Sequence, residues 1–325
     1  MSEATRQKIK ELEEELSKTK YNKRTQHAIG LLKAKIAGLK EKAEHHEKKG
    51  PAAYGYSVKK TGDATAVLLG FPSVGKSTLL NKLTNAKSEV AAYEFTTLTV
   101  IPGLLEHKGA KIQILDVPGV LEGASTGTGR GKEVIQVIRN SDLLLILTDA
   151  TRPRQLDVLY NELQSANIRL NEKIPDVKIT KTIRGGVRVG KTVRLTKLTD
   201  ETIKAICNEL RITNAEVLVR QDITADQMID VIRGNRKYLP SIVIANKIDK
   251  LSEDKHKDLQ ADIKISALQG KGIDELKELM FSKLEITRIY CKQIGKAADT
   301  ETPLIMKSNP TVEDMCRKLH KDFVA

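Results

Sequence analysis

The sequence has no tryptophan, and aromatic residues make up only 3% of its 325 residues. Its hydrophobic core must therefore be mainly aliphatic. Cysteine is also scarce, because Cys207, Cys291 and Cys316 are the only three and lie far apart. That spacing fits neither paired disulfides nor the close cysteine pairs of a zinc site. We expect reduced thiols.

Long apolar runs are missing as well. The N-terminal stretch MSEATRQKIK lacks the apolar core of a secretory signal peptide. No stretch approaches the roughly 18 apolar residues that a membrane-spanning helix needs. We therefore expect a cytoplasmic protein, long enough for about two or three domains.

Acidic residues are fewer than basic ones, because the chain has 42 Asp and Glu but 55 Lys and Arg, which gives a net charge of +13. Such an excess attracts polyanions. The favoured partner is nucleic acid or the ribosome. An anionic membrane surface is disfavoured because no apolar anchor accompanies the charge, and a merely solvated basic surface stays as the alternative.

The residue pattern divides the chain into several regions. Apolar runs of strand length, separated by helix-length segments, predict an α/β fold with a mostly parallel sheet. An interruption too long for a loop must hold an inserted α+β subdomain. The expected regions are a helical hairpin (1–50), a linker (51–63), the α/β domain (64–167 and 239–287), the insert (168–238) and a C-terminal tail (288–325).

The insert has a basic strand pattern. KITKTIRGGVRVGKTVRLTKL, residues 178–198, alternates apolar and basic residues around glycines, which predicts a hairpin with one cationic face. The cations are Lys178, Lys181, Arg184, Arg188, Lys191, Arg194 and Lys197. Such a stripe neutralises phosphates without recognising a base sequence, and the lack of interleaved aromatics favours structured RNA over stacked single strands.

The insert also contains a helix signal. Thr224 and Gln227 predict a capping box at the start of a helix, and Gly234 predicts its end.

The stretch GFPSVGKST fits the phosphate-loop pattern, with a predicted strand before it and a helix after it. Its backbone amides and helix N-terminus would bind phosphates, Lys76 would place a charge between the outer phosphates, and Ser77 would be a magnesium ligand. The expected nucleotide-binding residues are Gly70, Phe71, Pro72, Ser73, Val74, Gly75, Lys76, Ser77 and Thr78.

The stretch NKID follows a later strand and points to guanine. The Asp249 carboxylate can accept hydrogen bonds from N1–H and the 2-amino group of guanine, and adenine offers neither arrangement. Lys247 can lie along the base plane, and the Ala267 amide, after the next strand, can meet the guanine O6. The expected base-binding residues are Asn246, Lys247, Asp249, Ser266, Ala267 and Leu268.

Two further loops would complete a GTP site. A threonine of EFTTLT can ligate magnesium while γ-phosphate is present, and Thr97 is preferred over Thr96. In DVPG, Asp116 can hold a magnesium-bound water and the Gly119 amide can bind the γ-phosphate. We assign catalytic roles to Lys76, Thr97 and Gly119. The remaining expected contacts in these loops are Phe95, Val117 and Pro118.

Together these motifs resemble a known family. FTTLT and DVPGVLEGASTGTGRG resemble the Obg branch of translation-factor-class GTPases. TQHAIGLLKAKIAGLK, GFPSVGKSTLLNKLT and the long insert before NKID are closer to the developmentally regulated GTP-binding (DRG) proteins, archaeal members included. The resemblance implies a helical hairpin, a G domain, an insert similar to a domain-2 fold of a ribosomal protein, and a TGS domain of β-grasp type. TPLIMKSNPTVEDMCRKLHKDF matches only the first half of a TGS domain, so we expect a partial one and a family domain that continues past Ala325.

Val120 occupies the position where many guanine-nucleotide switches have a glutamine that orients the attacking water. The resemblance implies that an apolar residue is ordinary there. Hydrolysis should then be slow without help. A partner residue, Arg130 or Lys132 in cis, or a potassium ion can supply the missing charge, although Ser73 stands where some potassium-using relatives have Asn.

The leading hypothesis is therefore a GTP-hydrolysing switch that binds GTP/GDP and Mg²⁺, with K⁺ as a candidate, and acts on the ribosome or structured RNA. A regulatory protein of the type found with the DRG family is a further candidate partner. One alternative is a nucleotide-gated adaptor with negligible turnover. Another is a nucleic-acid chaperone with a vestigial site, which would not bind guanine at all.

Overall fold

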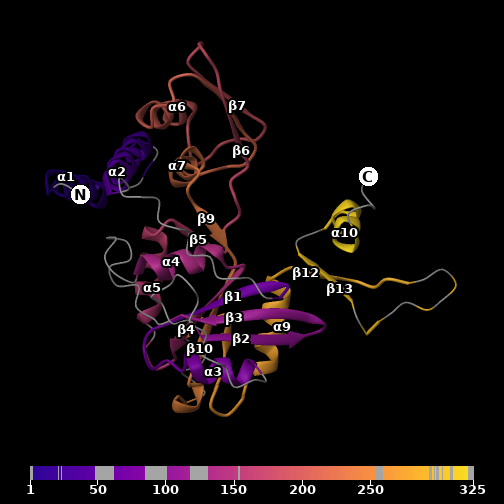
Figure 1. The fold of residues 1–325 in the computed structure, drawn as a ribbon. Coiled ribbons are helices and arrows are strands. Elements are labelled where there is room, and N and C mark those ends of the chain that lie inside the picture. Colours follow the sequence, from indigo (N-terminus) through magenta and orange to yellow (C-terminus); the bar gives the residue numbers. More distant parts are fainter. Residues whose placement is uncertain are drawn as a thin grey trace. The chain divides into compact units, whose positions relative to one another are not determined.

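The computed structural model describes residues 3–20, 22, 24–47, 62–84, 101–117, 131–152, 154–252, 259–292, 295, 297, 300–301, 303–307 and 310–320. The chain divides into two compact units, each formed from two stretches of sequence (Figure 1). One contains residues 1–55 and 173–236, and the other contains 56–172 and 237–325. In the described part of the chain, no helix has the length and apolarity needed to cross a membrane.

The second unit is built on a six-stranded sheet with the order β11-β10-β4-β1-β3-β2. Its strands are β1 (Ala64–Leu69), β2 (Ile101–His107), β3 (Ala110–Asp116), β4 (Leu143–Asp149), β10 (Ser241–Asn246) and β11 (Ile263–Lys264). All neighbours pair in parallel except β2, which is antiparallel to β3. The predicted mostly parallel sheet is confirmed.

The edge strand β2 is absent from the sequence-based prediction because IPGLLEH contains Pro102 and Gly103, which weaken a strand pattern. The glycine has a packing role. A Cβ at Gly103 would lie 2.8 Å from Leu80 and 2.5 Å from Thr84, in and just after α3 (Lys76–Leu83). Gly103 therefore allows the helix to approach the sheet edge closely.

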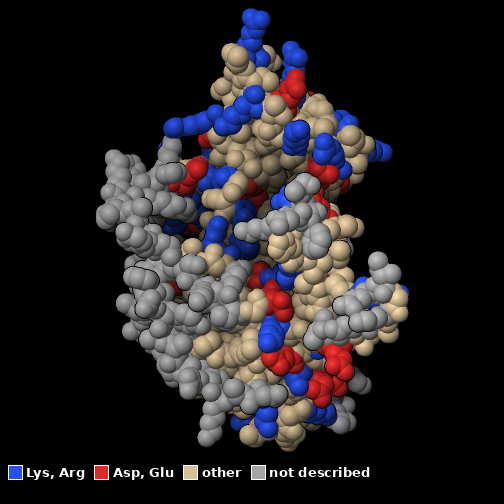
Figure 2. Space-filling view, turned by 45° about the vertical axis from the view of Figure 1, so that its right-hand side comes forward, with Lys and Arg blue, Asp and Glu red and all other residues tan. Residues whose placement is uncertain are grey.

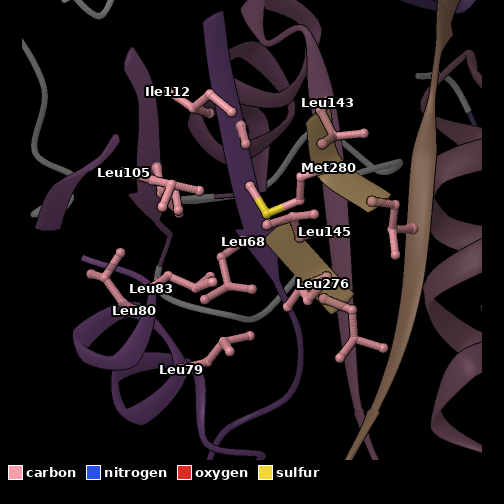
Figure 3. Packing of buried hydrophobic residues seen from close by; sticks show 14 of the residues in the cluster. Leu68, Leu79, Leu80, Leu83, Leu105, Ile112, Leu143, Leu145, Leu276 and Met280 are labelled. Atoms are coloured by element: carbon pink, nitrogen blue, oxygen red, sulfur yellow. The ribbon is translucent and has the colours of Figure 1, made fainter. Parts of the chain in front are cut away.

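Helices cover both faces of this sheet, because the central strands are apolar on both sides. Leu68 and Leu145 face α3 and α9 (Ile273–Lys283) in one cluster, which Figure 3 shows with Met280 of α9. Leu144, on the other face, packs with α4 (Gly131–Asn140) and α5 (Gln155–Ser165). This two-sided burial positions the loops that follow the carboxyl ends of the strands.

Smaller elements complete this unit. β5 (Ile168–Leu170) and β9 (Lys237–Leu239) pair in parallel, and η1 (Ile248–Lys250) is a short 3-10 turn. β12 (Ile286–Ile289) and β13 (Leu304–Lys307) form an antiparallel pair, followed by α10 (Val312–Leu319). The predicted tail strand and helix are present, but the described residues do not make a β-grasp fold. The partial TGS domain stays a prediction.

The first unit has a three-stranded sheet and four helices in its described residues. They are α1 (Glu3–Lys18), α2 (Gln26–Glu47), β6 (Val177–Lys181), β7 (Val187–Lys191), α6 (Asp200–Glu209), β8 (Ala215–Val219) and α7 (Ala225–Arg233). The Thr224–Gln227 capping box and the left-handed Gly234 at the end of α7 are confirmed.

The predicted hairpin of β6 and β7 is wrong, since β8 lies between them, antiparallel to β6 and parallel to β7. The single cationic stripe is wrong for the same reason. Lys178 and Arg188 lie on the exposed face, with Glu216 beside Arg188 in register. Lys191 instead pairs with Asp200 of α6 at 2.8 Å. The other cations occupy strand ends and loops.

Helix α2 packs against the insert and completes its core. Ala34 is fully buried in the same cluster as residues of α6, α7 and β8. A Cβ at Gly30 would lie 2.8 Å from Thr202 of α6. Lys33 also pairs with Asp226 at 2.5 Å. The N-terminal helices and the insert are therefore parts of one compact unit.

Candidate functional site

The phosphate loop connects β1 to α3, as the sequence predicts. Gly75 has φ 97° at the helix N-terminus, and Ser73 has φ 63°, so backbone in the left-handed region shapes the loop. The Lys76 ammonium donates hydrogen bonds to the carbonyl oxygens of Gly70 and Phe71 at 3.0 and 3.2 Å. The loop thus curves around the lysine, which is the arrangement needed to surround phosphate oxygens.

Asn246 links the phosphate loop to both loops of the predicted base site. Its side-chain nitrogen donates to Val74 O at 2.8 Å, and its side-chain oxygen accepts from the Ala267 amide at 2.9 Å. The residue is 3% exposed. We expected the Ala267 amide to meet the guanine O6, whereas in the structure it holds Asn246.

Lys247 connects the phosphate loop to the end of β4. Its ammonium donates to Ser73 O at 2.6 Å and to Asp149 Oδ2 at 2.8 Å. The other oxygen of Asp149 accepts hydrogen bonds from the backbone N–H and the hydroxyl of Thr151 at 2.9 and 2.7 Å. Burial pulls the Asp149 pKa upward, but the hydrogen bonds from Lys247 and Thr151 and the lysine charge outweigh burial and lower this pKa to about 2.

Asp249 lies in the turn after Lys247, beside the loop that follows β11. Ser266 Oγ donates to Asp249 Oδ1 at 2.5 Å. Among the described residues, Asp249 Oδ2 accepts no hydrogen bond. The carboxylate is therefore oriented by one oxygen and keeps acceptor capacity on the other. Leu268, two residues beyond Ser266, is 75% exposed.

Asp116 and Ser77 come together at the phosphate end of the site. Ser77 Oγ donates to Asp116 Oδ2 at 3.0 Å, while the buried Asp116 Oδ1 has no hydrogen-bond partner among the described residues. Burial raises the Asp116 pKa against the opposing effects of Ser77 and Lys76. Burial also lowers the Lys76 pKa, against the attraction of Asp116. Val117 is fully buried in the core, so its side chain does not face this site.

Part of the predicted site lies outside the described residues. This applies to Phe95, Thr96, Thr97, Pro118 and Gly119, and also to Val120, Arg130 and the side chain of Lys132. The roles of Thr97 and Gly119 stay predictions.

Asp149 and Thr151 are absent from the predicted site residues, and Asp149 was predicted only as the last residue of a buried strand. A usable signal was present. Asp149 ends β4, and β4 pairs with β10, whose last residue is Asn246 of the NKID motif. An acidic residue at the carboxyl end of that neighbouring strand lies where ligands bind in parallel sheets.

Comparisons with known proteins agree with this geometry. A family described as "50S ribosome-binding GTPase" matches residues 65–181. A second, described as the "C-terminal region of MMR_HSR1 domain", matches residues 184–286. Among solved structures, Era of Aquifex aeolicus bound to GDP.AlF4- aligns with 69% of this chain and 57% of that chain, at 21% identity and a TM-score of 0.36. That likeness is too distant to bear on function.

Several curated proteins align with nearly the whole chain. An uncharacterised GTP-binding protein of Methanocaldococcus jannaschii is 52% identical over 98% of this chain and 83% of its own length. Ribosome-interacting GTPase 1 of Saccharomyces cerevisiae is 42% identical, and developmentally-regulated GTP-binding protein 2 of Homo sapiens is 41% identical. Both alignments cover 98% of this chain and 89% of the relative. The chain belongs to the developmentally regulated GTP-binding (DRG) family of P-loop GTPases.

Proposed function

We propose that this chain is a slow GTP-hydrolysing switch that acts in translation by binding the ribosome or structured RNA. The observation that carries the proposal is the Asn246 cross-link, which joins the phosphate loop to the base loops. It supports a single site in which Lys76 meets the phosphates and Asp249 meets the base.

Selection of guanine follows from the chemistry of Asp249. The carboxylate keeps acceptor capacity after Ser266 has oriented it. Guanine presents N1–H and a 2-amino group as adjacent donors, whereas adenine would leave the charge without a partner. Lys247 forms a wall along the base plane. Discrimination by a site built to hydrogen-bond its ligand reaches about 10⁴-fold or more.

The residues at the phosphate end fit a magnesium ion. The buried Asp116 Oδ1 has no hydrogen bond within the described residues, and the Ser77 hydroxyl lies beside the same carboxylate. Oxygen ligands of this kind suit Mg²⁺, which keeps several of its waters. Ser77 would ligate the ion directly, Asp116 would hold one of its waters, and Thr97 is the proposed third ligand. The ion would neutralise charge on the phosphates, and Lys76 would do so from the other side.

Turnover is expected to be slow because Val120 cannot orient a water. An absent charge-stabilising group costs about 3–5 decades in rate in GTPases that rely on one. The three candidate sources are a partner residue, Arg130 or Lys132, and a potassium ion. A ribosome-bound partner is the source that would make hydrolysis depend on the translational state.

The cationic surface of the insert supports an RNA partner. Lys and Arg side chains project from this unit at the top of Figure 2. The cations Lys178, Lys181, Arg184, Arg188 and Arg194 of the insert are exposed and make no ion pair with described residues. Phosphate neutralisation by such groups gives affinity that falls with salt. A 42% identical relative is named a ribosome-interacting GTPase.

A single-turnover assay of [γ-³²P]GTP hydrolysis, with and without ribosomes and with K⁺ or Na⁺, tests the enzymatic part. Stimulation by ribosomes or K⁺ supports the switch. If guanine nucleotide binds but no condition gives turnover, the nucleotide-gated adaptor is the better description.

Ribosome co-sedimentation across nucleotide states and salt concentrations tests the partner. Reversing Lys178 and Arg188 to Glu should weaken binding and flatten its salt dependence. The matched control reverses Lys82 and Lys283, which lie in the other unit on α3 and α9. Equal effects of the two double variants would show only a general charge effect and would contradict a role for this surface.

A further inference from the structure

We infer that Asp149 is a positioning residue for the guanine nucleotide, because it holds Lys247 against the phosphate loop so that the lysine stem forms a wall of the base pocket. The inference rests on the proposed function, in which Lys247 lies along the base. Asp149 itself does not touch the nucleotide in this arrangement.

The Lys247 ammonium lies between two oxygens from different loops. Ser73 O is 2.6 Å away and Asp149 Oδ2 is 2.8 Å away. The side chains of Lys247 and Asp149 are only 25% and 11% exposed. A lysine stem that is free in solution samples many rotamers, and ordering it when a ligand binds costs free energy. Two fixed anchors order it beforehand.

We call the contact between Asp149 and Lys247 the clamp. It requires that Asp149 is itself rigidly held. Thr151 donates to Asp149 Oδ1 through both its backbone N–H and its hydroxyl. The parallel register places Asp149 beside Asn246, and the next amide, Ala150 N, donates to Asn246 O at 2.9 Å. Lys247 therefore leaves β10 next to a carboxylate whose position is set by the sheet.

The backbone of Lys247 gives a second reason for the clamp. Its φ of 65° and ψ of 35° lie in the left-handed region, which disfavours a residue with a side chain. Such a conformation persists where surrounding contacts fix it, and the side-chain contacts to Ser73 and Asp149 are two such contacts. The Asp149 pKa of about 2 keeps its carboxylate ionised between pH 5 and 8.

The clamp affects the binding of GDP and GTP and does not affect the rate of GTP hydrolysis in the bound state. Asp149→Asn keeps an oxygen for Thr151 but removes the charge that holds Lys247. The expected result is about 10-fold weaker binding of both GDP and GTP, seen as faster release of a fluorescent GDP, because hydrogen bonds to charged groups carry energies of this order. The single-turnover hydrolysis rate at saturating GTP should be unchanged.

A double-mutant cycle tests whether Asp149 acts through Lys247. In a Lys247→Met background the Asp149→Asn change should no longer alter GDP release, since the group it positions is gone. A merely structural role would give the same effect in both backgrounds, and that result would overturn the inference. Asp157→Asn is the matched control. It removes the same charge nearby, on the exposed side of α5, and should leave GDP release unchanged.

Thr151→Val provides a second route if Asp149→Asn does not fold. It keeps the carboxylate but removes the hydroxyl that orients it, so GDP release should again accelerate in the native background and stay unchanged with Lys247→Met. No acceleration in the native background overturns the inference. If Lys247→Met alone leaves GDP affinity intact, the proposed base-binding role of Lys247 fails instead. If Lys247→Met weakens binding and Asp149→Asn does not, only the clamp is wrong.

Discussion

Asn246 donates a hydrogen bond to Val74 O across 172 residues of sequence, at 2.8 Å, and so joins the phosphate loop to the NKID loop. Its side-chain oxygen also accepts a hydrogen bond from Ala267 N at 2.9 Å. In this arrangement Asn246 organises the site.

Replacing Asn246 with alanine should therefore weaken GTP and GDP equally. The change leaves the Val74 carbonyl and the Ala267 amide without their partner, at a cost of about 1–3 kcal/mol for a buried polar group. Calorimetry of both nucleotides and thermal unfolding measure the two effects. A loss confined to GTP would mean that Asn246 senses the γ-phosphate and would contradict the organising role.

Gly75→Ala should strongly lower the thermal stability of the chain, because the added methyl group would collide with Asn246. A Cβ there would lie 2.5 Å from the Asn246 side-chain nitrogen, and the φ of 97° already disfavours any side chain. The control is Gly38→Ala in α2, where nothing lies within 4 Å of the added carbon. That variant should be neutral or up to about 1 kcal/mol more stable, because alanine favours a helix. Similar losses of thermal stability in both variants would contradict the steric argument.

The Asp149 charge should stabilise the fold in a pH-dependent way. Its folded pKa of about 2 lies below the ordinary 3.8, so the contribution is present above about pH 4 and is lost as pH falls toward 2. The full effect is about 2 kcal/mol, and about 1 kcal/mol of it is gone at pH 3. Denaturant unfolding of the native chain and Asp149→Asn at pH 5 and pH 3 measures the difference. A gap that widens at pH 3 would contradict the depressed pKa.

The cysteines should differ in reactivity toward a thiol reagent. Burial raises the Cys207 pKa to about 11, so it should stay unmodified in the native protein and react only on unfolding. Cys291 is exposed and should react at once. The fast phase should therefore disappear in a Cys291→Ser variant. If a fast phase remains in that variant and Cys316 is not modified, it comes from Cys207 and contradicts the burial of Cys207.

Much of the α/β fold could be predicted because its central strands are apolar on both faces. Runs such as ATAVLL and LLLILTD have no other stable location than a sheet covered by helices on both sides. The order of β6, β8 and β7 could not be predicted in the same way. Alternation shows that a strand exists, but its pairing depends on contacts with Ala215–Val219, some 24 or more residues later than β7.

The phosphate loop and the NKID loop could also be predicted from the sequence, because each motif needs particular residues at fixed spacing. The contacts between residues within the site could not be predicted. Asp149 and Lys247 meet because β4 and β10 are neighbours in register, which is a property of the folded sheet. The sequence likewise predicts that the Ala267 amide meets the guanine O6, whereas this amide donates to Asn246, because β10 and β11 are neighbours in the folded sheet.

Guanine recognition by Asp249 is tested most directly by calorimetric binding of GTP, ATP and XTP to the native chain and to Asp249→Asn. We expect the native chain to prefer GTP to ATP by about 10⁴-fold or more. In Asp249→Asn, the carboxamide can donate to the 2-oxo group of xanthine, so preference should move from GTP to XTP. If ATP binds the native chain as tightly as GTP does, or if Asp249→Asn keeps its preference for GTP, Asp249 does not recognise the base and the proposed guanine site is wrong.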